Sequence, residues 1–245
     1  MGHQHRIVSS QMKNVIIVIE DYLEKTHDGT SLGKVRNSLN EFAQKYNQLD
    51  HEEASIYGAD GKELKHINQK HSTQVDLNEI TEYLNKEGVT GCHIDHNHPI
   101  NHYEDSVPSS LSIPDMDMLR IKNDKGEYIY QSISAESKNG YRMTLIRNNN
   151  FSPEDEPKFQ ITTGHLNESC RAYYDAFKQT SKRWANQHAK EYADKGYSLD
   201  QFEKECTKQT LKELGSFEDF IFNERDYNRS FEQCNCKLRI TKTNA

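Results

Sequence analysis

Apolar residues near the start of the chain recur at helical spacing. Between residues 12 and 25 they fall on one face of a helix, which predicts an amphipathic segment. Ser31 is a suitable cap for a second helix that extends to about Leu49, and Asp28-Gly29 predicts a tight turn between the two. Residues 1–48 are therefore predicted to form an N-terminal helical hairpin.

The pattern then changes to short strands and helices in alternation. Ala54 to Tyr57 and Leu64 to Ile67 flank an Asp60-Gly61 turn, which predicts a β-hairpin. A helical pattern follows and ends at Gly88, a typical helix C-terminus. The next strand is predicted from Val89 to His98.

A polar stretch and a second hairpin complete this region. Ile100 to Leu111 is rich in Asn, Asp, Pro and Ser and is predicted to be a loop, and Ser112 to Lys122 a short helix. Glu127 to Ser134 and Tyr141 to Arg147 then predict two paired strands. The order of elements predicts an α/β fold of the α+β kind, a small mixed-sheet sandwich that spans residues 49–148.

Residues 149–245 carry little strand pattern. Asn148 to Thr163 is polar and contains two prolines, so it is predicted to be a linker. Leu166 to Lys195 is predicted to be one long helix. A last strand, Lys237 to Thr241, is predicted to return to the sheet. The region is therefore a linker and a helical C-terminal extension, with capacity to bind a partner in a protein complex.

Three aromatic residues share one face of that long helix. Tyr173, Phe177 and Trp184 are separated by four and seven positions, which places them on the same side. Two interpretations follow: the face packs the helix against the sandwich, or it helps to select the substrate.

Composition excludes several classes of function. Of the 245 residues only 33% are hydrophobic, whereas about 45–50% is typical when glycine is included, so a modest core is expected. The formal net charge is -7 and no basic stripe is present, so nucleic acid is not an expected partner. No apolar run reaches the roughly 20 residues that cross a bilayer. Five cysteines, an odd number, fit a reducing, cytoplasmic setting.

The run His96-Asn97-His98-Pro99, followed by Ser112-Ile113-Pro114-Asp115, carries the clearest chemistry. Alternate residues of a strand share a face, so His96 and His98 can bind one ion together. Asp115 would lie in the first turn of a helix that Ser112 opens. Two imidazoles, one carboxylate and an open position for water are a composition found in catalytic zinc sites.

These motifs resemble those of the JAMM-type metallopeptidases of the JAB/MPN family: an upstream Glu, then His-x-His-Pro, then Ser-x-x-Asp. The resemblance implies that His96, His98 and Asp115 bind Zn2+, that Glu52 activates water and that Ser112 stabilises the oxyanion. It departs from the family in the long loop between Pro99 and Ser112. It also leaves Glu53 as an alternative base, although Glu52, two positions before a small residue, is preferred.

The function that the resemblance implies is hydrolysis of an amide bond in a protein or peptide substrate by a zinc-dependent peptidase or isopeptidase. A second interpretation is a non-catalytic MPN-like module that serves assembly of a phage or bacterial complex. A third is an HNH-type metal nuclease, because Asp95-His96 resembles the Asp-His core of that class. The absence of a basic surface and of a nearby cysteine pair weighs against the nuclease.

Each site residue also has a simpler interpretation. Ser112-x-x-Asp115 is an ordinary helix-capping pattern. Asp117 and the Asp155 of Ser152-x-x-Asp155 are rival carboxylates, although Pro157 is expected to prevent a helix after the second. Some histidines of the His-rich stretch are expected to be bystanders. Two further pairs are weak metal candidates: His3 with His5, and Cys234 with Cys236.

Overall fold

The protein is described by a computed structural model over residues 41–42, 44–46, 49, 51–68, 76–98, 111–137, 141–215 and 227–242. It combines a six-stranded mixed sheet with helices, which confirms the predicted mixing of the two. The strands are β1 (Glu53–Tyr57), β2 (Glu63–Asn68), β3 (Cys92–Asn97), β4 (Tyr130–Ser137), β5 (Tyr141–Arg147) and β6 (Cys236–Lys242). The helices are α3 (Asn78–Glu87), α4 (Ile113–Asp117), α5 (Glu156–Asp194), α6 (Leu199–Leu214) and α8 (Tyr227–Glu232), with a 3-10 turn η1 (Met118–Arg120) after α4.

The strands lie in the order β2-β1-β3-β4-β5-β6. Neighbours are antiparallel except for β3 and β4, which are parallel. Strand β3 therefore lies inside the sheet, and all six of its residues are buried. Both predicted hairpins and the predicted return of a C-terminal strand to the sheet are confirmed. Helix α3 ends at Gly88, whose positive φ of 65° is the left-handed conformation that glycine adopts easily.

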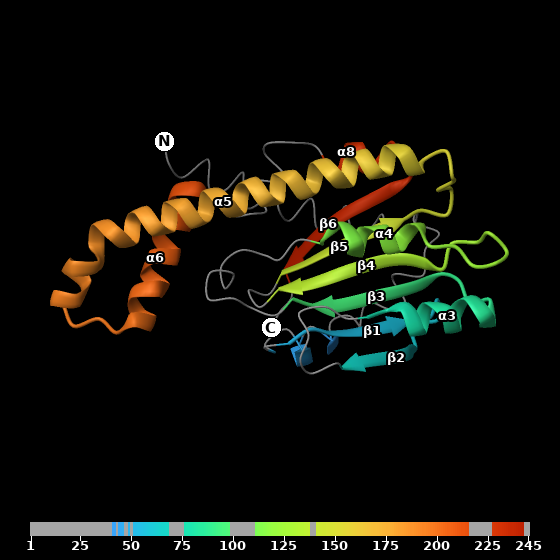
Figure 1. Ribbon diagram of the computed structural model, residues 1–245, viewed down its shortest axis with the longest axis horizontal. Coiled ribbons are helices and arrows are strands. Elements are labelled where there is room, and N and C mark those ends of the chain that lie inside the picture. Colours follow the sequence, from blue (N-terminus) through green and yellow to red (C-terminus); the bar gives the residue numbers. More distant parts are fainter. Residues whose placement is uncertain are drawn as a thin grey trace, which may run out of the picture.

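The two faces of the sheet differ in polarity. Ile56, Ile94 and Ile133 lie on one face, where they join a hydrophobic core with residues of α3, α4 and α5. Figure 1 shows α3 and α4 on this side of the sheet. The other face carries polar residues such as Asp95 and Glu136, which are nevertheless fully buried. Because side chains alternate along a strand, β3 presents its odd-numbered residues to the polar face and its even-numbered residues to the core face.

Helix α5 begins earlier than the sequence pattern predicted. The predicted linker from Asn148 to Thr163 is wrong in its second half, because the helix starts at Glu156 and continues for 39 residues. The expectation that Pro157 prevents a helix after Asp155 is wrong as well. Proline is tolerated in the first turn, where its missing N–H has no intrahelical partner. Asp155 precedes this turn and accepts hydrogen bonds from Ser152.

The aromatic face of α5 serves packing over most of its length. Tyr173 and Phe177 are buried in the main core, which confirms the packing interpretation for both. Trp184 lies beyond the sheet edge, where its ring stacks on that of Phe202 in α6 with centroids 5.7 Å apart. Figure 1 shows this distal part of α5 and the returning α6 projecting away from the sheet.

The division into residues 1–48, 49–148 and 149–245 stays a prediction, but the second and third segments share one core. Strand β6 pairs with β5 along its whole length, and Phe159 and Leu166 of α5 are buried in that core. Of the first segment, residues 41–42 and 44–46 are helical, and the rest, with His3 and His5, lies outside the described residues. The predicted loop from Ile100 to Leu111 lies outside them too, apart from Leu111. No helix within the described ranges is long and apolar enough to span a membrane.

Candidate metal centre

The two histidines of the motif come from the end of β3. His96 is 3% exposed and lies on the core face, opposite Ala54 of β1. His98 follows the strand, and its backbone N–H still donates to the carbonyl of Glu136, 3.1 Å away, which extends the pairing with β4. The two Nε2 atoms are 2.9 Å apart. The strand therefore directs both imidazoles to one point, as the alternation predicted.

Helix α4 brings Asp115 to the same point. Its Oδ1 lies 3.6 Å from Nε2 of His96, and its Oδ2 lies 3.8 Å from Nε2 of His98. Ser112 is the N-cap and forms a complete capping box with Asp115, so the simpler capping interpretation is confirmed for this pair. The Ser112 backbone N–H and hydroxyl both donate to Oδ2, at 2.7 and 2.6 Å. The cap therefore fixes the orientation of the carboxylate that faces the histidines.

Glu52 approaches the histidines from β1. It immediately precedes the strand and is 8% exposed. Ala54 pairs with His96 across the antiparallel ladder, so Glu52, two residues earlier, lies on the same face and close to His98. Ligand atoms of Glu52, His96 and His98 all lie within 4.8 Å of one another. Among the described residues, these three form the group that could hold a metal ion.

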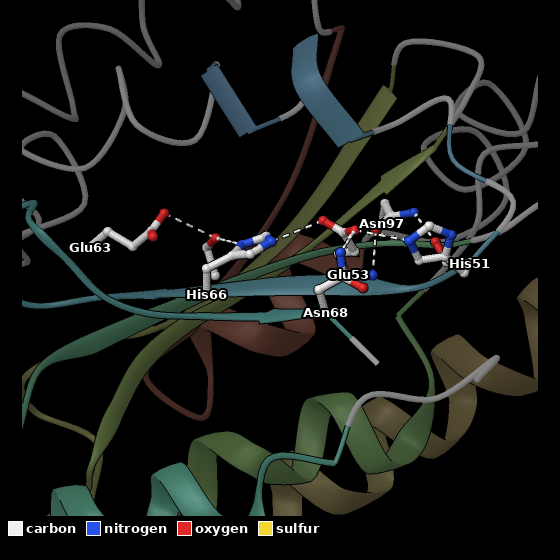
Figure 2. A network of polar contacts seen from close by, with 7 residues as sticks. His51, Glu53, Glu63, His66, Asn68 and Asn97 are labelled. Carbon is white, nitrogen blue, oxygen red and sulfur yellow. Dashed lines mark hydrogen bonds and ion pairs between the residues drawn. The ribbon is translucent and has the colours of Figure 1, made fainter. Parts of the chain in front are cut away.

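Glu53 points to the opposite face and is held in a network of its own (Figure 2). Its Oε1 accepts from Nδ2 of Asn68 at 2.5 Å and lies 2.9 Å from Nε2 of His51. Its Oε2 lies 2.9 Å from Nε2 of His66. Ser55 bridges His66 to Glu63 at the far end of the network. Glu53 thus joins β1 to β2, and the geometry favours Glu52 as the one of the two adjacent glutamates that faces the histidines.

Electrostatics favour a neutral His98 and an ionised Asp115, the forms that bind metal ions, whereas His96 is held toward its protonated form, so an ion would have to displace that proton. Burial and the neighbouring His96 lower the pKa of His98 to about 4, so this imidazole is neutral at pH 7. Burial also opposes charge on His96, but the carboxylates of Asp115 and Glu52 outweigh it and raise the pKa of His96. Burial opposes charge on Asp115 as well, yet both imidazoles and the Ser112 hydroxyl hold the pKa of Asp115 well below its usual range. A carboxylate and a neutral imidazole are the forms that bind metal ions.

The donor set fits Zn2+. Zinc accepts imidazole nitrogen and carboxylate oxygen, and catalytic sites use three protein ligands with one open position. His96 and His98 offer the two nitrogens, and two carboxylates are near enough to complete the set: Asp115, 3.6 and 3.8 Å from the histidines, and Glu52, which belongs with both to the group of three within 4.8 Å. Nε2 is the nitrogen of His96 placed to bind, because it faces His98 and Asp115, while the buried Nδ1 has no hydrogen-bond partner among the described residues.

The rival residues lie elsewhere. Asp117 pairs with Arg120 at 2.9 Å, and Asp155, which immediately precedes α5, accepts hydrogen bonds from the backbone N–H and the hydroxyl of Ser152. Asp95 lies on the polar face with Arg142, 3.8 Å away, so Asp95 and His96 do not form the Asp-His pair of an HNH-type site. Cys234 and Cys236 are buried free thiols, and within the described ranges neither belongs to a three-ligand group.

Comparison of the chain with protein-family models, with curated proteins and with solved structures finds no match.

Sequence reasoning missed the residues on the polar face of the sheet that contact the segment around Glu52. Asn97 lies between the two histidines and contacts the backbone on both sides of Glu52. Strand alternation places Asn97 on the reverse face, but its partners depend on the β1–β3 register, which no local pattern shows. His51 and His66 carried no sequence signal that linked them to the site.

His93 is a structural histidine on the polar face. Its Nδ1 lies 2.6 Å from the hydroxyl of Ser132, and burial lowers the pKa of His93 to about 4. The imidazole is therefore neutral at pH 7, in agreement with the bystander role expected for part of this stretch.

We expect His93 to make the fold sensitive to acid. Its pKa is lower in the folded state than the usual value of about 6.5, so the unfolded chain binds more protons between pH 6.5 and 4 and stability falls as the pH drops through this window. At about 1.4 kcal/mol per pKa unit, the loss is at most about 3 kcal/mol. Urea unfolding of metal-free protein at pH 7 and pH 4.5 measures it. His93→Asn should lose less stability than the wild type over this interval, and an equal loss would contradict the assignment.

Proposed function

We propose that the protein is a zinc-dependent peptidase or isopeptidase that hydrolyses an amide bond in a protein or peptide substrate. The observation that carries the proposal is the convergence of His96, His98 and Asp115, three residues from two elements, with the Glu52 carboxylate beside them. This arrangement supports the assignment of the first three as ligands and of Glu52 as the catalytic base. The order of these residues in the sequence is similar to that of the JAMM-type family.

A bound Zn2+ lowers the pKa of a coordinated water from its bulk value to about 7 and polarises a carbonyl oxygen. Glu52 is placed to accept the proton of a water molecule held near the histidine pair, since its carboxylate lies within 4.8 Å of the ligand atoms of both histidines and the proposal assigns the carboxylate ligand to Asp115. The same carboxylate then returns the proton to the leaving amine. Glu52 approaches the site from β1, whereas Asp115 belongs to α4. Proton transfer by Glu52 therefore does not require Asp115 to move.

Ser112 has two roles in this proposal. Its hydroxyl donates to Oδ2 of Asp115, which orients a metal ligand from outside the coordination sphere. In the proposed reaction the hydroxyl turns from Asp115 to the developing oxyanion, a type of hydrogen bond that contributes strongly to catalysis. The backbone N–H of Ser112 continues to donate to the same Oδ2 and keeps the carboxylate in place.

A non-catalytic assembly module is the second candidate. The distal half of α5 and the returning α6 project from the sheet, and Tyr197 in the turn between them and Leu199 at the start of α6 are exposed, which suits contact with another protein. This feature is also compatible with substrate selection, so it does not separate the two functions.

Cleavage of a peptide library derived from a whole proteome separates them. Zinc-loaded protein should generate new peptide termini, detected by mass spectrometry, and a chelator should abolish them. Readdition of Zn2+ should restore cleavage. Protein that holds zinc but cleaves nothing in the library would favour the assembly module.

A further inference from the structure

The residue between the two histidines makes an unusual pair of contacts. Asn97 is fully buried and lies on the polar face of the sheet, where Figure 2 shows it beside Glu53 and His51. Strand alternation puts it on the opposite side from His96 and His98. Its Oδ1 accepts a hydrogen bond from the backbone N–H of Glu53 at 2.7 Å. Its Nδ2 donates to the backbone carbonyl of His51 at 2.8 Å. The orientation of the amide is determined, because one partner can only donate and the other can only accept.

These two partners are the peptide groups on either side of Glu52. The His51 carbonyl belongs to the peptide that precedes Glu52, and the Glu53 N–H belongs to the peptide that follows it. A single side chain therefore restrains both backbone dihedral angles of Glu52. The β1–β3 ladder runs from Ala54 to Tyr57, so at Glu52 the Asn97 amide takes the place of ladder hydrogen bonds.

The Glu53 network lies beside this arrangement and acts on a different side chain. Glu53 is 3% exposed, and its carboxylate has polar partners from His51, His66 and Asn68. These contacts join β1 to β2 through the Glu53 side chain, whereas Asn97 bonds the peptide groups on either side of Glu52. Glu52 is left as the residue of this segment whose side chain faces the histidines.

We propose that Asn97 is a positioning residue that fixes the Glu52 carboxylate relative to the site formed by His96 and His98. Because Asn97 lies between these two histidines in β3, it couples the position of the base directly to that of the ligands. The inference rests on the proposed function, since Glu52 needs a fixed position only if it acts on a water molecule at that site. Loss of such supporting contacts typically reduces activity or affinity by about 10- to 100-fold.

The test uses the full chain loaded with Co2+, whose visible absorption reports the ionisation of groups at the site. Asn97→Ala should still bind one Co2+, because the histidines and Asp115 are unchanged. Glu52→Gln should lower the pH midpoint of the absorption change, since a carboxylate beside the ion opposes loss of a proton. Asn97→Ala should shift the midpoint in the same direction, by about half as much, and the double variant should shift it no further than Glu52→Gln alone.

Asn68→Ala is the matched control, because Asn68 contacts the Glu53 carboxylate but neither peptide of Glu52. It should leave the midpoint unchanged. A shift in Asn68→Ala as large as that in Asn97→Ala, or additive shifts in the double variant, would overturn the positioning role while the proposed function stands. Wild-type protein that binds no Co2+ or Zn2+ would overturn the proposed function itself.

A second measurement on the wild type does not depend on the folding of any variant. Hydrogen exchange should show the Glu53 backbone N–H to be protected with and without Co2+, because the Asn97 contact is already formed in the metal-free protein. A Glu53 amide that exchanges as fast as an exposed loop amide would contradict the contact.

Discussion

Replacing His96 or His98 with alanine should strip the metal from the protein. In the proposed site each imidazole is one of three protein ligands, and Asp115 cannot hold an ion with a single remaining partner. Zinc binding free energies of roughly 10–16 kcal/mol shared by four ligands give about 2.5–4 kcal/mol each, or on the order of 70- to 900-fold in Kd. Elemental analysis after dialysis measures the outcome: about one zinc per wild-type chain and almost none in either variant.

His93→Asn is the control for this result. His93 belongs to the same strand and is buried, but it faces the opposite side and contacts Ser132. The variant should therefore keep its zinc. If His93→Asn loses zinc as readily as His96→Ala, or if the His96 and His98 variants retain it, the ion is bound elsewhere or not at all.

Glu52→Gln should have the largest effect on activity while leaving the metal in place. The amide keeps the size of the side chain but cannot accept a proton, and general-base catalysis contributes about 10²- to 10⁴-fold to a rate. A loss of that size in kcat, with zinc content unchanged, is expected for any peptide that the wild type cleaves. Asp115→Asn should show the reverse pattern and lose the metal first, because Asp115 is assigned as a ligand. If Glu52→Gln loses zinc and Asp115→Asn keeps it, the two assignments are exchanged: Glu52 is the ligand and Asp115 the base.

Glu53→Gln is the matched comparison for Glu52→Gln. The Glu53 carboxylate is surrounded by hydrogen-bond donors. The amide NH2 group of a glutamine at this position would therefore face at least one other donor, an unfavourable contact. We expect a loss of about 1–3 kcal/mol in the free energy of unfolding. Activity per folded molecule should stay within a few-fold of the wild type. An inactive Glu53→Gln beside an active Glu52→Gln would make Glu53 the base.

Much of the fold could be predicted because it depends on local rules. Turn residues at Asp60-Gly61, a glycine at the end of α3 and alternation through β3 all act within a few residues of themselves. The beginning of α5 could not be predicted in this way. Pro157 ends a helix in most settings but is accepted in a first turn, and no local pattern shows that α5 begins at Glu156, one residue before the proline.

The candidate site divides along the same line. The shared face of His96 and His98 follows from a period of two, and the orientation of the Asp115 carboxylate within its helix follows from the capping box with Ser112. The nearness of Asp115 to the histidines depends on the packing of α4 against the sheet. The choice between Glu52 and Glu53 does not follow from any local pattern, since adjacent residues on a strand face opposite sides. It is decided by the register of β1 against β3, which places Ala54 opposite His96. Asn97 depends on the same long-range pairing and was missed for the same reason.

The most direct test of the proposed centre is the position of the ion itself. Crystals of zinc-loaded protein should give one anomalous scattering peak at the zinc absorption edge. We expect it about 2.0–2.2 Å from Nε2 of His96, Nε2 of His98 and a carboxylate oxygen of Asp115, with Glu52 close by but not bound. A peak at another cluster, or fully loaded crystals without a peak between these three residues, would contradict the account.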